Sequence, residues 1–184
     1  MDPTERWQVV DLVLDAQAGS EVAFAVLARR WDRRLVAHAW RLLGDAETAR
    51  EAAQAAWLEI VRGLKRLREP AAFPAWAYRI TTRQAAAIIR RRQGERRLSA
   101  DLQTAVATEP QTVDASEPDT SAALYAAIRA LPPDQRAAIA LHHFEGLSVA
   151  ETAVALDAPV GTIKTRLMHA RRKLRAALEG DTHD

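Results

Sequence analysis

The stretch LSVAETAVALDAPVGTIKTRLMHARRKLR, residues 147–175, decides the fold of the C-terminal part of this chain. Ser148 and Glu151 stand three residues apart before an apolar run, which is the spacing of a capping box at a helix start. The first helix should stop before Pro159, and a second should begin at Val160. Two helices separated by so short a turn predict a helix-turn-helix.

The second predicted helix has two different faces. Apolar side chains at helical spacing define an inward face formed by Ile163, Leu167, Ala170 and Leu174. The opposite face carries Lys164, Thr165, Met168, His169 and Arg172. A basic face on the second helix of such a motif suits the major groove of DNA. The alternative interpretation is an ordinary helical hairpin with a solvated basic face.

The N-terminal part also has helical patterning. A helix capped by Ser20 should end at Gly44, and a second should begin after Asp45. A third long helix, with Pro74 in its first turn, should end before Gly94. Because no useful strand alternation occurs, the predicted fold class is all-α.

Charge is divided unevenly along the chain, although the formal net charge is only +2. Residues 1–98 hold 18 Lys or Arg against 12 Asp or Glu, whereas residues 99–121 hold 5 acids and no base. Residues 122–184 have 8 bases and 7 acids, but 6 of these bases lie within 164–175, which contains no acid. The middle stretch is too polar to offset the entropy of ordering. The sequence therefore predicts two small helical domains, 1–98 and 122–184, joined by a flexible acidic linker, 99–121.

Composition excludes several classes of function. The chain has no cysteine, so disulfides and thiolate zinc sites are impossible. It has no Gly-rich phosphate loop with Lys and Ser or Thr, and its 5 histidines form no helical pair at metal spacing. We expect no metal, no cofactor, no small-molecule substrate and no enzymatic activity. Without a basic start followed by an apolar run, we expect a cytoplasmic protein with no direct membrane insertion.

The C-terminal motifs resemble the region 4 domain of extracytoplasmic-function (ECF) RNA polymerase sigma factors. The resemblance rests on LPPDQR at 131–136, FEGLS at 144–148, PVGTIKTRL at 159–167 and ARRKLR at 170–175. It implies that the last helix reads the −35 promoter element. The side chains implied to contact DNA are His142, Lys164, Thr165, Arg166, Met168, His169, Arg172 and Arg175.

The N-terminal part resembles the region 2 domain of the same family. Residues 45–58 resemble the acidic, glutamine-containing helix that binds the polymerase largest subunits, although Ala55 stands where an acid is frequent. The implied polymerase contacts are Glu51, Gln54, Trp57 and Glu59.

Residues 67–92 resemble the segment that binds and melts the −10 element, including a loop that holds an extruded base. The implied DNA contacts are Arg68, Pro70, Ala71, Phe73, Trp76, Arg79, Arg83, Arg90 and Arg91. Trp76 and Tyr78 lie two apart on one helix and cannot point the same way, so one of them should belong to the core. Trp31, Trp40 and Trp57 are expected to be structural.

Together these resemblances imply an alternative sigma factor, with core RNA polymerase, promoter DNA and an anti-sigma factor as partners. One alternative is an operator-binding helix-turn-helix regulator whose first domain dimerises or senses a ligand. The basic, aromatic helix in the N-terminal half argues against it. A second alternative is a sigma-like protein that binds polymerase without directing initiation, and Ala55 keeps it open.

Overall fold

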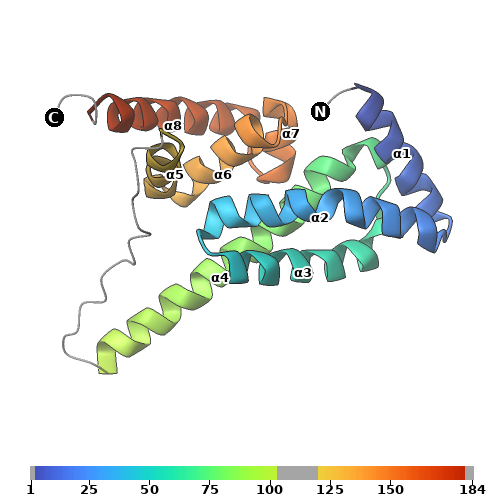
Figure 1. Cartoon of the computed structure of the whole chain (residues 1–184), viewed down its shortest axis with the longest axis horizontal. Coiled ribbons are helices and arrows are strands. Elements are labelled where there is room, and N and C mark those ends of the chain that lie inside the picture. Colours follow the sequence, from blue (N-terminus) through green and yellow to red (C-terminus); the bar gives the residue numbers. More distant parts are fainter. Residues whose placement is uncertain (1–2, 103–119, 181–184) are drawn as a thin grey trace.

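The computed structural model describes residues 3–102 and 120–180, in which there are helices and no strand, so the all-α prediction is confirmed (Figure 1). The N-terminal part contains α1 (Pro3–Gln17), α2 (Glu21–Leu43), α3 (Ala46–Gly63), η1 (Leu64–Arg66), η2 (Pro70–Ala72) and α4 (Phe73–Leu102). The C-terminal part contains α5 (Thr120–Ala130), α6 (Pro133–Ile139), the π-helical turn η3 (Ala140–Phe144), α7 (Val149–Ala155) and α8 (Val160–Gly180). Most of the predicted linker lies outside the described residues.

The helix ends in the N-terminal part follow from local side chains. The Ser20 hydroxyl accepts a hydrogen bond from the Ala23 amide at 3.2 Å, and an Asp45 carboxylate oxygen accepts one from the Thr48 amide at 2.9 Å. Gly44 ends α2 with φ +76°, a left-handed conformation that a glycine adopts without strain. These three predicted boundaries are confirmed.

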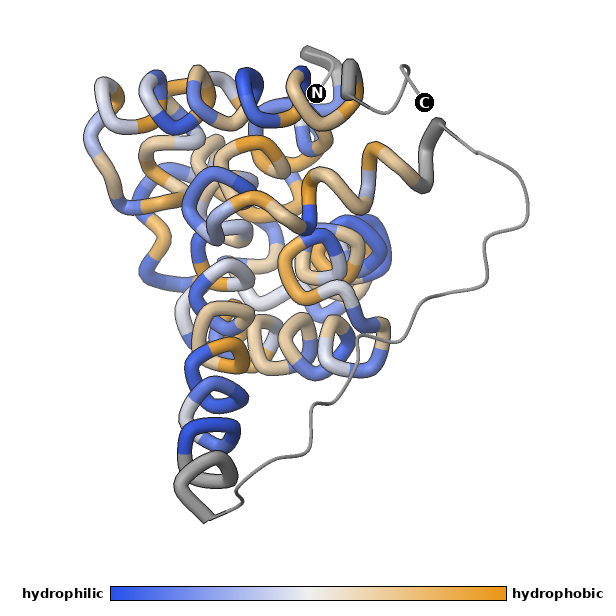
Figure 2. Tube along the Cα trace, turned by 90° about the vertical axis from the view of Figure 1, so that its left-hand side faces the viewer, coloured by the Kyte–Doolittle hydropathy of each residue, from blue (hydrophilic) through white to orange (hydrophobic). Residues whose placement is uncertain are grey.

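The prediction that the third helix ends before Gly94 is wrong. α4 continues through Gly94 to Leu102, and its hydrophilic turns around Gly94 extend beyond the rest of the bundle (Figure 2). One glycine in a helix costs only about 1 kcal/mol relative to alanine, which does not by itself end a helix. Arg91 and Arg92, just before Gly94, pair with acids, as described below.

The N-terminal core is built around Trp31 on α2. Its ring packs edge to face against Phe73, with centroids 5.3 Å apart, and against Tyr78, with centroids 5.6 Å apart. Trp31, Phe73 and Tyr78 are buried, whereas Trp76 is only partly buried. Trp31 is therefore structural, as predicted, and Tyr78 is the core member of the Trp76 and Tyr78 pair.

The C-terminal core confirms the predicted inward face of α8. Ile163, Leu167 and Ala170 are buried, and Leu174 packs against them. Both bonds of the capping box at the start of α7 are present, from the Glu151 amide to the Ser148 hydroxyl at 3.1 Å and from the Ser148 amide to the Glu151 carboxylate at 2.8 Å.

The two parts pack directly against each other, which the sequence did not predict. α5 and α6 lie against α2, and α7 lies against α4 (Figure 1). Leu141, Leu147 and Ala155 from the C-terminal part join the hydrophobic cluster that contains Trp31. The main core therefore includes side chains from both parts of the chain.

His38 on α2 is a fully buried polar side chain in this arrangement. Its Nε2 atom lies 2.8 Å from the Thr82 hydroxyl, and its ring packs against Tyr78. Burial, together with the nearby charge of Arg41, lowers the pKa of His38 from 6.5 to about 3. The imidazole is therefore neutral in the folded protein at physiological pH.

The folded protein should lose stability as pH falls below 6.5, because the unfolded chain binds a proton at His38 that the folded chain does not bind. Between pH 7 and pH 5 this group should lower the free energy of unfolding by about 2 kcal/mol. Urea unfolding of the natural chain and of His38→Gln at both pH values measures the difference. An equal loss of stability in the two proteins would contradict this assignment.

Candidate nucleic-acid interface

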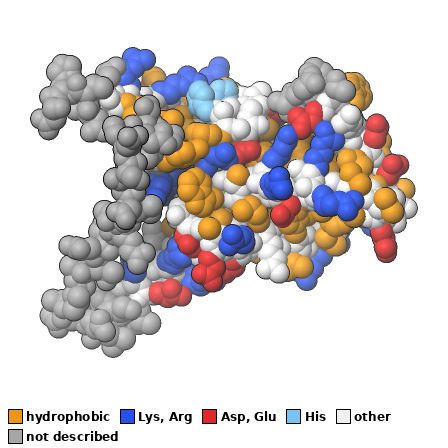
Figure 3. Space-filling model, in the orientation of Figure 1, with side chains coloured by type: hydrophobic (Ala, Val, Ile, Leu, Met, Phe, Trp, Pro, Cys, Tyr) orange, Lys and Arg blue, Asp and Glu red, His pale blue; other side chains and the backbone are white. Residues whose placement is uncertain are grey.

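α8 presents an exposed polar and basic face. Lys164, Thr165, Met168, Arg172 and Arg175 are exposed, and the relative exposure of Met168 is 57%. His169 is partly buried, and its Nδ1 lies 3.2 Å from an Arg172 nitrogen. Lys and Arg side chains gather along α8 in Figure 3. The predicted outward orientation is confirmed for Lys164, Thr165, Met168 and Arg172, whereas His169 is only partly exposed.

The turn between α7 and α8 determines which side of α8 points outward. Asp157 has φ +50°, a left-handed conformation that Asp tolerates better than most residues. The Ala158 amide donates to the Ala153 carbonyl at 3.0 Å, which closes the end of α7. The Pro159 carbonyl accepts from the Ile163 amide at 3.1 Å, which starts α8. Ile163 is thereby directed into the core, and Lys164 outward.

Two of the predicted −35 contacts are engaged inside the domain. Arg166 lies 2.6 Å from an Asp134 carboxylate oxygen, and its side chain is 25% exposed. The Nδ1 atom of His142 lies 2.7 Å from the Leu147 carbonyl oxygen, so this nitrogen must donate. Arg166 and His142 are thus less available to DNA than the exposed face of α8.

The predicted −10 arginines form an exposed row on α4. Arg79, Arg83, Arg90 and Arg91 are all exposed, as helical spacing predicts. Arg79 pairs with Asp157 of the C-terminal part at 2.9 Å, and Arg83 pairs with Glu59 of α3. A phosphate would have to displace these carboxylates to bind the same guanidinium groups.

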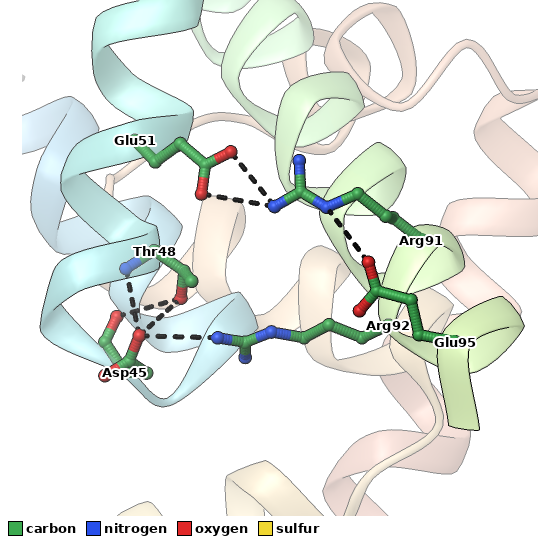
Figure 4. Close-up of polar contacts among 6 residues, drawn as sticks. All are labelled: Asp45, Thr48, Glu51, Arg91, Arg92 and Glu95. Carbon is green, nitrogen blue, oxygen red and sulfur yellow. Dashed lines mark hydrogen bonds and ion pairs between the residues drawn. The ribbon is translucent and has the colours of Figure 1, made fainter. Parts of the chain in front are cut away.

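Ion pairs join α3 and α4 along their shared edge (Figure 4). Arg91 bonds both Glu51 oxygens, at 3.1 and 3.3 Å, and also faces Glu95 at 4.0 Å. Arg92 faces Asp45 at 3.6 Å. Hydrogen bonds from the Thr48 amide and hydroxyl lower the pKa of Asp45.

This edge brings together two sets of predicted contacts. Glu51 and Glu59 are implied to bind polymerase, whereas their partners Arg91 and Arg83 are implied to bind DNA. Exposed ion pairs contribute about 0–1 kcal/mol each, so both members can exchange partners at little cost. These ion pairs therefore prevent neither the binding of polymerase by Glu51 and Glu59 nor the binding of DNA by Arg91 and Arg83.

The loop before α4 shows that one predicted DNA contact is misplaced. The Phe73 side chain is 0% exposed and packs on Trp31, so it cannot reach a base in this structure. The Trp76 ring is next to that of Phe73 and packs closely on Gly63. A Cβ atom added to Gly63 would lie 2.9 Å from the Trp76 indole. Arg68 and Ala71 are exposed, and Pro70 is partly buried.

The sequence also gave no sign of how this loop is anchored. The Gln17 amide nitrogen at the end of α1 donates to the Leu64 and Leu67 carbonyls, both at 2.8 Å. Gln17 thus fixes the loop that the resemblance assigns to base capture. Nothing in its local sequence marks it, because its partners lie almost 50 residues away.

The predicted polymerase face on α3 contains apolar residues that the sequence reasoning missed. Glu51 and Gln54 are exposed, and Glu59 is partly buried. Trp57 is also partly buried, and its ring contacts that of Phe24, which is partly buried as well. Trp57 donates its indole N–H to Asp32 at 3.0 Å, which indicates a structural role. Leu58 and Val61 are 57% and 55% exposed beside them. Their spacing of three would have revealed this patch once the buried face of α3 was known.

Residues 3–102 and 120–180 contain neither a candidate metal site nor a candidate membrane span. In these ranges no group of three His, Cys, Asp or Glu side chains could hold a metal ion. Among the same residues, no helix has the length and apolar character needed to cross a bilayer.

Comparison with known families matches both parts of the chain. The model described as sigma-70 region 2 matches residues 27–95, and the model described as sigma-70, region 4 matches residues 121–174. The matched segments contain the exposed row on α4 and, except for Arg175, the exposed face of α8.

Curated relatives extend over most of the chain. The RNA polymerase sigma-H factor of Pseudomonas aeruginosa is 29% identical over 178 residues, which are 91% of this chain and 92% of that protein. The ECF RNA polymerase sigma-E factor of Escherichia coli is 29% identical over 181 residues, covering 91% and 93% of the two chains. The ECF RNA polymerase sigma factor SigE of Mycolicibacterium smegmatis is 32% identical over 153 residues, 81% of this chain and 59% of that protein.

Solved structures show the same fold. CnrH, in complex with the cytosolic domain of CnrY, has a TM-score of 0.71 at 22% identity, covering 95% of this chain and 99% of CnrH. The sigma factor RpoE of Bartonella quintana, in complex with the anti-sigma factor NepR, has a TM-score of 0.68 at 22% identity, covering 85% and 96%. From its region 2 and region 4 matches and these relatives, the chain belongs to the sigma-70 family, as an ECF RNA polymerase sigma factor.

Proposed function

We propose that this sigma factor binds core RNA polymerase and directs initiation at selected promoters, with α8 on the −35 element and α4 on the −10 element. The observation that carries the proposal is the pair of exposed basic surfaces, one in each family-matched segment. The polypeptide has no catalytic role of its own. In the proposed domain organisation, residues 1–98 bind polymerase and the −10 element, residues 99–121 form a linker, and residues 122–184 bind the −35 element.

The geometry of α8 supports reading of the −35 element in the major groove. Lys164 and Thr165 lie near the N-terminal end of the helix, the end that reaches base edges in helix-turn-helix proteins. Arg172 and Arg175 lie two to three turns later, where a helix leaves the groove and meets phosphate. The proposed contacts with DNA therefore divide into base reading and positioning.

The geometry of α4 and its preceding loop supports a melting role. Proteins that hold single strands combine basic grooves with stacking surfaces. The row Arg79, Arg83 and Arg90 supplies the basic track. Trp76, one helical turn before Arg79, is only partly buried, whereas Tyr78 is buried, so Trp76 is the aromatic side chain available for stacking. The loop with Arg68, Pro70 and Ala71 would receive an extruded base, above the buried Phe73.

The proposed partners are core polymerase, promoter DNA and an anti-sigma factor, and the proposed compartment is the cytoplasm, where the first two partners reside. Polymerase would contact α3 through Glu51, Gln54 and Glu59, with Leu58 and Val61 adding apolar area. An anti-sigma partner is supported by the complex in which the structurally similar RpoE was solved.

Run-off transcription with core polymerase tests the function directly. The purified chain should give promoter-specific transcripts, while the chain alone should bind DNA weakly and in a strongly salt-dependent manner, because each domain alone has few contacts. Gel-shift titrations with and without core polymerase provide the comparison. Tight binding of a homodimer to a palindrome without polymerase would instead identify an operator-binding regulator.

Lys164→Ala and Arg175→Ala should have different effects on promoter choice. Lys164→Ala should change discrimination at one −35 position by about 1 to 3 kcal/mol, because a base contact distinguishes between bases. Arg175→Ala should weaken all promoters alike, because a phosphate contact is blind to sequence. Transcription from a panel of single-base −35 variants measures both effects. A uniform loss with Lys164→Ala would show that Lys164 contacts only the backbone.

Replacement of residues 68–72 by a Gly and Ser segment should impair duplex promoters more than promoters already mismatched at the −10 element. The loop is proposed to offset part of the unpairing free energy, which a premelted template does not require. Arg83→Ala with Arg90→Ala provides the matched control, since phosphate contacts serve both templates. Permanganate reactivity of unpaired thymines reports the melting. Equal defects on both templates, with normal thymine reactivity, would rule out base capture by this loop.

A further inference from the structure

Glu145, at the end of η3, inserts its carboxylate into the N-terminal part of the chain. One oxygen accepts a hydrogen bond from the Tyr78 hydroxyl at 2.5 Å, and the other lies 2.5 Å from an Arg41 nitrogen. The Glu145 side chain is only 6% exposed, and that of Arg41 is 17% exposed. Region 4 thus places a buried acid between two side chains of region 2.

The socket that receives Glu145 is built on the core. The Tyr78 ring is fixed between Trp31 and His38, so its hydroxyl has a defined position at the surface of region 2. The Arg41 guanidinium lies 4.6 Å from the centre of the Phe144 ring, next to Glu145 in sequence. Rigid aromatic side chains therefore hold both donors.

Insertion of Glu145 brings α7 onto the DNA-binding face of α4. Asp157 then forms an ion pair with Arg79, and Glu151 forms one with Arg6 on α1. A groove remains between the parts, lined by Arg79, Thr82 and Arg83 on one side and by Asp157 and Arg166 on the other. Arg79 and Arg83, proposed for the −10 element, thus face Arg166, proposed for the −35 element, across this groove, and DNA must displace Asp157 to bind the Arg79 guanidinium.

The buried contact differs in kind from the interdomain ion pairs Arg79–Asp157 and Arg6–Glu151. Asp157 and the Arg6 side chain are 76% and 51% exposed, so their pairs are readily replaced by water or phosphate. Burial raises the pKa of Glu145, and its hydrogen bonds to Tyr78 and Arg41 oppose that shift. Removal of one member of such a group leaves the others buried without a partner, which strongly disfavours the docked arrangement.

We propose that the Arg41, Tyr78 and Glu145 contact is an intramolecular lock, which holds region 4 against α4 and keeps Asp157 on Arg79, at one end of the −10 surface, until Glu145 is withdrawn. The lock is a contact within one chain, and it forms without DNA or polymerase. Its consequence for DNA rests on the proposed function. The fraction of open molecules limits the apparent affinity for DNA, so opening the lock raises affinity without adding a contact.

Distance measurement between two spin labels tests the lock without DNA or polymerase. The chain has no native cysteine, so Arg62→Cys on α3 and Lys173→Cys on α8, both at exposed positions, give two defined labels. The natural residues at the lock should give one narrow distance distribution. Glu145→Ala should add a broad population at longer distance, and Tyr78→Phe, which keeps the buried ring, should do so to a lesser extent.

Matched controls separate the lock from general loss of charge. Asp134→Asn removes a region 4 carboxylate whose partner, Arg166, is in the same domain. Arg29→Ala removes an exposed arginine three turns before Arg41 on α2. Both controls should keep the narrow distribution. Circular dichroism should show unchanged helix content in every variant, and if Glu145→Ala fails this check, Tyr78→Phe decides the matter.

Binding of a single-stranded −10 oligonucleotide tests the consequence for DNA. Glu145→Ala should bind it roughly tenfold more tightly than the natural chain, if about one molecule in ten is open at rest. Unchanged distances in both Glu145→Ala and Tyr78→Phe would overturn the lock. Longer distances with unchanged oligonucleotide binding would overturn the claim that region 4 obstructs DNA at Arg79. Failure of run-off transcription with altered distances would refute the proposed function and leave the lock standing.

Discussion

The packing of Tyr78 is the interaction on which the rest of this structure depends. Its ring closes the region 2 core against Trp31, and its hydroxyl reaches the Glu145 carboxylate of region 4. Burial raises the pKa of the Tyr78 phenol, so it remains a hydrogen-bond donor across the physiological range. One side chain therefore fixes the direction of α4 and the position of the second domain.

Around this buried centre, the functional surfaces use weak and exchangeable contacts. The arginines of α4 pair with Glu51, Glu59 and Asp157, all at positions where water competes. Such pairs hold the arginines beside the carboxylates but do not commit them to one partner. A protein that must bind polymerase and DNA in turn needs surfaces of this kind, supported by a rigid core.

Local sequence signals were sufficient to locate several helix ends. The caps at Ser20 and Asp45 and the capping box of Ser148 and Glu151 involve neighbours three residues apart, so pattern alone located these helix starts. Gly94 misled the prediction because a glycine in an exposed helix is a small penalty and not a stop signal. Phe73 was misassigned because its burial depends on Trp31, which lies more than 40 residues away.

The sequence by itself determined the helical fold class, the helix-turn-helix, the outward face of α8 and the row of arginines on α4, since each follows from spacing along one helix. Only the tertiary structure decided that Phe73 is buried, that Gln17 anchors the loop before α4 and that Arg166 turns toward Asp134. It alone placed Glu145 against Tyr78 and Arg41. These contacts join residues distant in sequence, and their formation depends on how apolar faces from both domains exclude water together, which no local pattern records.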